Sequence, residues 1–189
     1  MTRRVHSLRR HDGSRHLLTN IRRCRPDERD AILAIVNAAA ARYRGVIPGD
    51  CWHEPYMTAE QLARDVAAGV TFWGYEDPEH EAGELRGVMG IQPVRDVVLV
   101  RHAYVRPDSQ GRGIGGALLD HLEALDGVAG RPILIGTWAD ATWAIAFYRA
   151  HGYALVPPAD AAALLARYWS GVSARQAEVS VVLAKGRAT

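Results

Sequence analysis

The stretch VRPDSQGRGIGGALLDHL, residues 105–122, carries the strongest signal in the chain. Four glycines open it, at positions 111, 113, 115 and 116. The apolar residues that follow recur at the spacing of one helix face, so a helix begins among these glycines. Inside a helix, glycine costs about 1 kcal/mol relative to alanine, so this start needs a compensating reason. Bare backbone N–H groups at the positive end of a helix dipole bind a diphosphate. A glycine turn kept only for tight packing is the alternative.

The glycine spacing excludes two common nucleotide-binding motifs. The stretch does not read GxxxxGK[ST], so it is not the phosphate loop of nucleoside triphosphatases. A Rossmann fingerprint needs Gly-x-Gly-x-x-Gly after an early parallel strand, with an acidic residue about 20 positions later. Here the spacing is Gly111-x-Gly113-x-Gly115, and it comes late in the chain, after three expected antiparallel strands.

Composition predicts one globular domain. The chain has 189 residues, 48% of them hydrophobic, and a net charge of +2, which does not indicate nucleic-acid binding by the chain as a whole. Residues 1–18 are rich in arginine and histidine, and we expect a disordered basic tail followed by a single domain over 19–186. A polyanion-binding arm is the alternative for the tail. It predicts salt-dependent DNA binding that is lost when residues 1–18 are removed.

The cysteines and the hydropathy of the chain indicate which metal sites and cellular compartments to expect. Neither Cys24 nor Cys51 belongs to a CxxC or CxH cluster, so we expect no structural zinc and no other metal. A chain with at most one cysteine pair fits the reducing cytoplasm. No apolar segment approaches the roughly 20 residues of a membrane-spanning helix, so we expect no membrane partner.

Local patterns predict helices and strands in an alternating order. The expected helices are 26–45, 58–69, 114–125, 140–152 and 160–171, and the expected strands are 20–25, 70–76, 85–94, 97–105, 131–138, 153–156 and 177–184. Thr58 is the expected cap of its helix, with Gln61 completing a capping box. The order predicts a mixed sheet covered by helices, in the α+β or α/β class.

At two places the sequence resembles a known family, the GNAT superfamily of N-acetyltransferases. Val105-Arg106-Pro107 followed by Gln110-Gly111-Arg112-Gly113 is similar to the acyl-CoA motif of that family, Gln/Arg-x-x-Gly-x-Gly/Ala. The segment AIAFYRAHGY, residues 144–153, is similar to its second signature. The resemblance covers about 20–184. It implies a mixed, largely antiparallel sheet of about six to seven strands with helices on both faces.

The resemblance also implies how acetyl-CoA binds as a cosubstrate. Its pyrophosphate would lie on the glycine turn, and its pantetheine arm along the strand that ends at Val105, in a gap between two splayed strands. A backbone N–H near residues 103–105 would polarise the thioester carbonyl. The expected cofactor-binding residues are Ala103, Tyr104, Val105, Gln110, Gly111, Arg112, Gly113, Ile114, Gly115 and Gly116.

Catalytic roles follow from the same resemblance. Tyr148 lies where many family members place a general acid for the departing thiolate, and a tyrosine packed in the core is the alternative. Some relatives carry a glutamate base on the strand 131–138, but the aligned residue here is Gly136. The remaining candidates for the base are His102 and, in the loop 45–57, Glu54 or His53, since an amine attacks only after it loses a proton. A structural role for His102 is the alternative.

The loop 45–57 is the expected wall of the acceptor site. It combines acidic groups with aromatic rings, which together would hold a cationic amine by ion pairing and cation–π contact. The expected acceptor-binding residues are Asp50, Trp52, His53, Tyr56 and Trp138. A polar loop whose aromatic residues anchor it to the core is the alternative.

The function expected from the resemblance is transfer of an acetyl group from acetyl-CoA to a primary amine by direct attack in a ternary complex. A small-molecule acceptor is favoured over a protein or peptide. A non-catalytic acyl-CoA-binding or sensing domain is an alternative from another class. The insertion 157–176 and the last strand offer a surface for a homodimer, although nothing in the sequence requires one.

Overall fold

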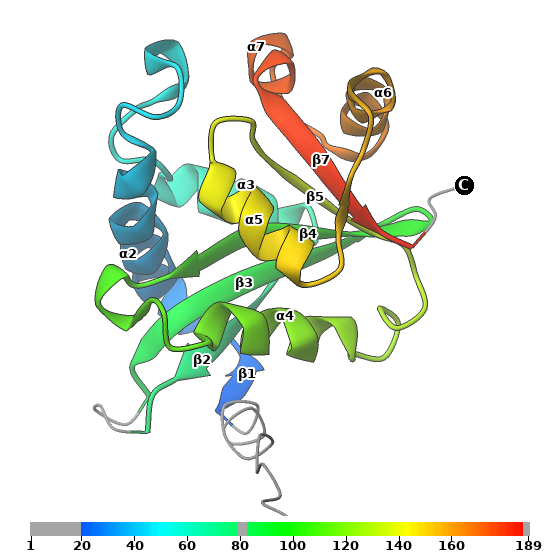
Figure 1. Ribbon diagram of the computed structural model, residues 1–189. Helices are drawn as coiled ribbons and strands as arrows, with labels where there is room; N and C mark the ends of the chain where they lie inside the picture. The colour runs from blue at the N-terminus through cyan, green and yellow to red at the C-terminus, as the bar shows by residue number, and fades with distance from the viewer. Residues whose placement is uncertain (1–19, 79–82, 187–189) are drawn as a thin grey trace, which may run out of the picture.

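The computed structural model describes residues 20–78 and 83–186 (Figure 1). The expected tail, residues 1–18, lies outside the described residues. Within the described ranges no helix is long and apolar enough to cross a membrane. The same ranges hold no group of three or more His, Cys, Asp or Glu side chains that could bind a metal ion.

A seven-stranded sheet forms the centre of the molecule, in the order β1-β2-β3-β4-β5-β7-β6. The strands are β1 (Ile21–Arg23), β2 (Thr71–Glu76), β3 (Leu85–Val94), β4 (Val97–Val105), β5 (Ile133–Trp138), β6 (Ala154–Leu155) and β7 (Ser180–Lys185). Among these described strands, β4 and β5 pair in parallel and the other neighbours pair antiparallel. The predicted mixed, largely antiparallel sheet is confirmed.

Helices cover both faces of the sheet, as predicted. They are α2 (Arg29–Ala40), α3 (Ala59–Ala67), α4 (Ile114–Glu123), α5 (Thr142–Ala150), α6 (Pro158–Tyr168) and α7 (Ala174–Glu178). Short 3₁₀ turns lie at η1 (Pro26–Glu28), η2 (Ala41–Tyr43), η3 (Gly49–Cys51) and η4 (Pro107–Ser109). In Figure 1, α4 and α5 lie in front of the sheet and α3 lies behind it.

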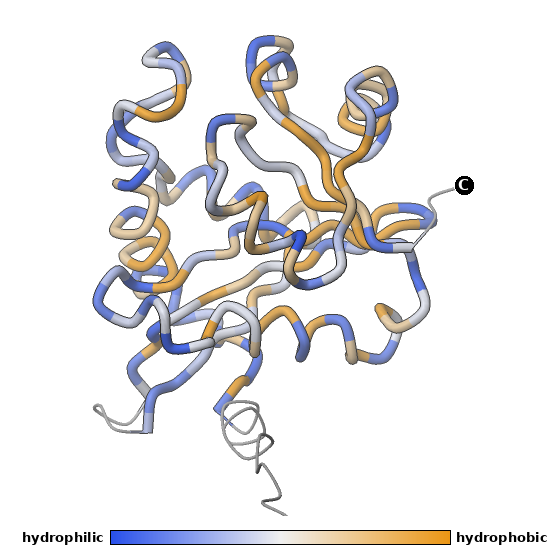
Figure 2. Tube along the Cα trace, viewed as in Figure 1, coloured by the Kyte–Doolittle hydropathy of each residue, from blue (hydrophilic) through white to orange (hydrophobic). Residues whose placement is uncertain are grey.

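The alternation along β4 separates the two layers of the core. Val98 and Val100 join the cluster that includes α4 and α5, whereas Leu99 packs with Leu165 of α6. The cluster of α2 and α3 lies on the same side as α6 and reaches β4 through Tyr104. Figure 2 shows hydrophobic stretches along the central strands and β7, with hydrophilic residues in many of the loops. Because both faces are covered, β4 and β5 run through the interior.

Capping decides two helix starts. The Thr58 hydroxyl accepts a hydrogen bond from the Gln61 backbone at 3.2 Å, which confirms the predicted cap of α3. A full capping box forms instead at Ser173 and Gln176, and it starts α7. The alternating pattern predicts a strand from residue 177, but β7 begins at Ser180. The box satisfies the first N–H groups of α7, so the residues up to Glu178 are helical.

Candidate active site

The adjacent strands β4 and β5 separate after a short parallel stretch. In the described part of the chain their pairing runs from Val98–Ile133 to Val100–Ile135. Beyond it, β4 continues along β3 while the rest of β5 pairs with β7. A cavity of about 590 Å³ is lined by residues 100–105 of β4 and 135–138 of β5, and by most of the glycine turn. The separation therefore opens the sheet at its centre.

The edge of β4 that faces this gap has backbone groups outside the sheet ladder. Between Arg101 and Val105 the strand pairs with β3 on its far edge, after β5 has already left. An unpaired edge of this kind binds an extended ligand as if it were another strand, through its N–H and C=O groups. A chain that carries amide groups, such as pantetheine, fits this edge.

A β-bulge in β4 decides which side chains face which layer. Two residues, His102 and Ala103, stand opposite the single residue Met89 of β3. His102 has a φ of 52°, in the left-handed region. Arg101 and His102 consequently both reach Asp65 of α3, whereas Ala103 packs with the cluster of α4 and α5. Regular alternation would send His102 to the opposite face.

The glycine turn leaves the start of α4 open. Gly111 and Gly113 have φ values of 77° and 82°, a conformation that costs other residues about 1–2 kcal/mol. None of the described side chains caps the first turn of α4, so its leading N–H groups keep their hydrogen-bonding capacity. A Cβ added to Gly111 would meet no atom within 4 Å. The geometry is that of a phosphate or diphosphate site at a helix start.

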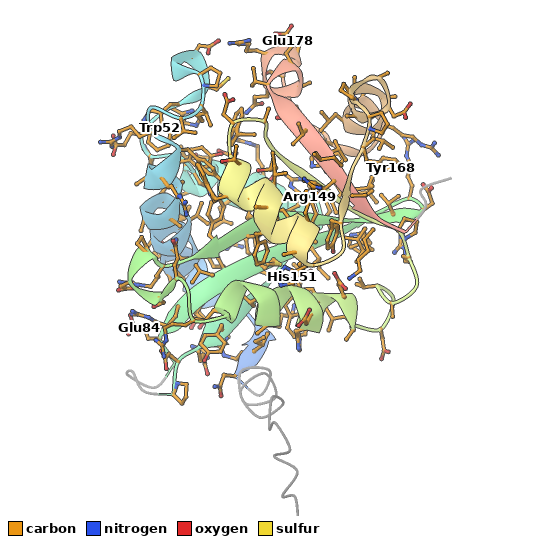
Figure 3. The ribbon with its side chains drawn as sticks, viewed as in Figure 1. Trp52, Glu84, Arg149, His151, Tyr168 and Glu178 are labelled. Atoms are coloured by element: carbon orange, nitrogen blue, oxygen red, sulfur yellow. The ribbon has the colours of Figure 1, made fainter. Side chains whose placement is uncertain are left out.

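Neighbouring side chains hold this turn in place. Gln110 donates from Nε2 to the Val105 carbonyl at 3.0 Å. Arg112 donates to the buried carboxylate of Asp77 at 2.7 Å. A Cβ at Gly116 would lie 2.9 Å from Nε2 of His151, and Figure 3 shows His151 between α5 and α4. Glycine at this position lets the end of α5 approach α4 closely.

Tyr148 of α5 lines the same cavity. Its ring is buried against Phe147 and Tyr153, with centroids 5.0 and 5.9 Å away. Its hydroxyl forms no hydrogen bond with the residues that the structure describes, whereas the Tyr153 hydroxyl donates to Glu123. Burial raises the pKa of Tyr148 above its ordinary value. The hydroxyl is therefore protonated at neutral pH and has its proton available to a ligand.

Three tyrosines meet at another part of the cavity lining. The ring centroids of Tyr43 and Tyr56 lie 5.5 Å apart, and those of Tyr43 and Tyr104 lie 6.5 Å apart. Trp138 donates from Nε1 to the Tyr56 hydroxyl at 2.8 Å. Burial raises the pKa of Tyr43 to about 12. Burial raises the pKa of Tyr56 and of Tyr104 as well, so all three hydroxyls are uncharged at neutral pH.

His102 is bound by a carboxylate from α3. Its Nε2 lies 2.9 Å from Oδ2 of Asp65, and its ring stacks on Phe72 at 5.7 Å. Burial acts to raise the Asp65 pKa, but the bond from His102 and the charge of Arg101 outweigh it, and the net pKa is lowered. Asp65 is thus ionised at neutral pH, and a neutral His102 carries its proton on Nε2. Nδ1 then has the lone pair.

Acidification is expected to destabilise the protein partly through His102. Burial lowers the His102 pKa from 6.5, and the bond to Asp65 only partly offsets this. The unfolded chain therefore takes up this proton at higher pH than the folded protein, so stability is lost as the pH falls from about 6.5 toward the folded pKa. Urea unfolding at pH 7.5 and 5.5 should show a smaller loss in His102→Gln. An equal loss in both proteins would contradict the lowered pKa.

Comparison with known proteins relates this structure to a family of acetyltransferases. Residues 68–155 match the family model described as acetyltransferase (GNAT) domain. A GNAT-family acetyltransferase structure from Staphylococcus aureus Mu50 aligns over 88% of this chain and 97% of its own, with a TM-score of 0.62 and 15% identity. These findings support membership of the GNAT superfamily.

Two further GNAT-like structures align over similar lengths. The PaiA N-acetyltransferase from Thermoplasma acidophilum, solved in complex with coenzyme A, covers 88% of this chain and 98% of its own, with a TM-score of 0.65 and 15% identity. The ribosomal-protein-S18-alanine N-acetyltransferase from Escherichia coli covers 87% and 90%, with a TM-score of 0.59 and 19% identity. No curated protein sequence matches the chain. At these identities the structural likeness establishes the shared fold.

Only part of the predicted acceptor set reaches the cavity. His53, Tyr56 and Trp138 line it. Trp52 lines a smaller hollow beside Asn37, and Figure 3 shows it on the loop that follows α2. Asp50 accepts a hydrogen bond from Arg175 at 2.8 Å. Glu54, whose side chain is 70% exposed, pairs with Arg44 at 2.7 Å. Both carboxylates are outside the cavity lining.

More of the predicted cofactor-binding and catalytic residues than of the predicted acceptor residues lie in the cavity lining. Tyr148, His102 and residues 103–105 line the cavity with Gln110, Gly111 and residues 113–116. Arg112 is directed to Asp77 instead and is outside the lining. The roles given to these residues stay predictions, and the structure adds that most of them share one cavity.

The sequence analysis missed several aromatic residues of the cavity, among them Tyr43 and Trp169. Tyr43 lies between Tyr56 and Trp143, with ring centroids 5.5 and 5.7 Å away. Trp169 covers Gly136, where an added Cβ would lie 3.4 Å from the indole. Tyr43 follows closely on the end of α2, and Trp169 follows directly on the end of α6. An aromatic residue just after a helix end was the sequence signal that could have identified both. The space beside Gly136, the position for which the resemblance implied a glutamate in some relatives, is next to the Trp169 indole.

Proposed function

We propose that the protein is an acyl-CoA-dependent N-acetyltransferase that moves an acetyl group from acetyl-CoA to a primary amine of a small molecule. The observation that carries this proposal is one continuous cavity. It joins the open start of α4, the unpaired edge of β4 and the unbonded hydroxyl of Tyr148. A diphosphate fits the first feature and amide groups fit the second. The Thermoplasma relative in complex with coenzyme A supports the same cosubstrate.

The roles of individual residues follow from this arrangement. The amine nitrogen forms a bond to the acetyl carbonyl carbon, and the bond from that carbon to sulfur breaks. Tyr148 gives its proton to the departing sulfur, which leaves as the thiol. The proton that the nitrogen loses as the amide forms restores the Tyr148 hydroxyl. Backbone N–H groups of β4 near Ala103 stabilise negative charge on the carbonyl oxygen.

His102 is the base in this proposal, because it lines the cavity and Asp65 fixes its tautomer. Its Nδ1 accepts the proton that the ammonium must lose before attack. Its lowered pKa keeps it neutral and able to accept at neutral pH. Glu54 does not take this role, because its exposed carboxylate pairs with Arg44.

The residues that follow α6 line one side of the cavity, and they favour a small acceptor. The segment after α6 contributes Trp169, Val172, Gln176 and Ser180 to the lining. An insertion that lines the cavity from this side narrows the space available to a polypeptide. The two free cysteines, Cys24 and Cys51, support a reducing compartment, and we propose the cytoplasm.

Acetyl-CoA is expected to bind the purified protein, and added amines are expected to cause release of the free thiol of CoA. Isothermal titration measures the first and a thiol-release assay against small amines and peptides measures the second. Binding with amine-dependent release supports the enzyme. Binding without release from any acceptor favours a sensing domain, and the covered Gly136 is the feature that keeps this second candidate open. Absence of binding contradicts both.

A further inference from the structure

The charge of the cavity lining points to the acceptor. Among the residues that the structure describes, no carboxylate side chain lines the cavity, whereas Arg42, Arg101, His53 and His102 do. The sequence predicts acidic groups that hold a cationic amine, but the structure places none of those carboxylates in the described lining. An arginine without a neighbouring carboxylate repels a simple ammonium ion, and it lowers the pKa of an amine bound beside it.

The nearby carboxylates are already engaged with arginine or histidine. Asp50 pairs with Arg175 and Glu54 with Arg44, each through an arginine nitrogen within 2.8 Å. Asp65 pairs with both Arg101 and His102. Arg101 is thereby compensated inside the protein.

Arg42 is the arginine of the described lining that pairs with no described carboxylate. Its guanidinium carbon lies 4.2 Å from the ring centroid of Trp143, and it makes no ion pair with a described carboxylate. It follows directly on α2, and the side chain is exposed to solvent. Stacking on an indole orients a guanidinium while leaving its N–H groups free to bind. A planar fork of donors without a partner suits a carboxylate.

Aromatic rings line the cavity beside this arginine and beyond it. Tyr43 stacks on Trp143 with ring centroids 5.7 Å apart. Trp138 and Trp169 line the cavity further on, from β5 and from the end of α6. These surfaces fit an aromatic or other flat apolar body better than a long polar chain.

We infer that the acceptor is an amine that carries its own anionic group, of the size and chemistry of an aromatic α-amino acid, and that Arg42 binds its carboxylate. The inference rests on the proposed acetyl transfer. The acceptor's carboxylate balances the charge of Arg42, and its side chain lies among the rings of Tyr43, Trp143 and Trp169. Arg42 is a specificity residue here and takes no part in the bond changes.

The test compares two acceptors that differ by one carboxylate, L-tryptophan and tryptamine. With saturating acetyl-CoA, kcat/KM is expected to be about 10- to 100-fold higher for L-tryptophan, the range for one charged hydrogen-bonding group. Arg42→Met should bring the two values within about threefold through a higher KM for L-tryptophan. Arg42→Lys, which keeps the charge and loses the fork, should recover part of the preference. Arg29→Met, an exposed arginine at the start of α2 and outside the cavity lining, is the matched control and should change neither value.

The affinity for acetyl-CoA separates this inference from its rivals. It should be unchanged in Arg42→Met, and a loss of tenfold or more would assign Arg42 to a CoA phosphate and overturn the inference. The inference is overturned if the unaltered protein uses tryptamine as well as L-tryptophan. It is also overturned if the protein neither acetylates L-tryptophan nor binds N-acetyl-L-tryptophan. If another amine still causes thiol release, the proposed function stands without the inference. If acetyl-CoA does not bind, the proposed function itself fails.

Discussion

Replacing Tyr148 with phenylalanine is expected to lower kcat by about 100-fold or more while the affinity for acetyl-CoA stays within about twofold. General acid catalysis contributes roughly 10²–10⁴-fold, and phenylalanine removes only the hydroxyl that would protonate the leaving sulfur. The ring is buried and its hydroxyl makes no described hydrogen bond. The substitution therefore breaks no internal bond of the folded protein, and stability should be nearly unchanged. Steady-state kinetics with titration of acetyl-CoA measure both effects.

Tyr153 offers a matched control for this substitution. It packs against Tyr148 at 5.9 Å and is equally buried, but its hydroxyl donates to Glu123 at 2.7 Å and it is outside the cavity lining. Tyr153→Phe should lower the free energy of unfolding by about 1–2 kcal/mol through that lost bond and leave kcat within about threefold. Equal losses of kcat in both variants would show that aromatic packing alone matters and that Tyr148 is no acid. The pH profile adds a second check, because the raised pKa of Tyr148 keeps it protonated, and it should produce no alkaline decline near pH 9.

Replacing Gly111 with alanine is expected to weaken acetyl-CoA binding by about tenfold or more. Its φ of 77° is strained for any residue with a Cβ, by about 1–2 kcal/mol, so alanine shifts the turn away from its present shape. The N–H groups at the start of α4 then lose the arrangement that fits a diphosphate. Titration with acetyl-CoA measures the change directly.

Gly127 provides the control for backbone strain. Its φ is 81°, and an added Cβ there also meets nothing within 4 Å, but it lies beyond the end of α4 and outside the cavity lining. Gly127→Ala should lower the melting temperature about as much as Gly111→Ala and leave acetyl-CoA affinity unchanged. If both variants bind acetyl-CoA like the unaltered protein, the diphosphate does not lie on the glycine turn.

Loop 45–57 shows where local sequence reasoning fails. Its mixture of acids and aromatic rings predicts a site for a cation, and part of that set does line the cavity. The direction of the acids depends on partners outside the loop. Arg175 is 125 positions away from Asp50, and Arg44 turns Glu54 outward to solvent. No pattern within the loop contains this information.

His102 depends on tertiary structure in the same way. The sequence placed it on a strand, but the bulge opposite Met89 decides which face it occupies. That face brings it to Asp65, 37 positions earlier in the chain. Trp169 over Gly136 and Tyr43 beside Trp143 are likewise contacts between distant elements.

The sequence by itself determined the order of the main helices and strands, the mixed sheet and the glycine turn at the start of α4. These features depend on neighbouring residues, because a left-handed glycine, a helix cap or an alternating strand acts within a few positions. Only the tertiary structure decided where β4 leaves β5, which acids are neutralised and that Arg42 is left without a carboxylate among the described residues. Ion pairs, stacking and burial join residues that folding brings together from distant positions, and their net charge is fixed only when all partners are in place.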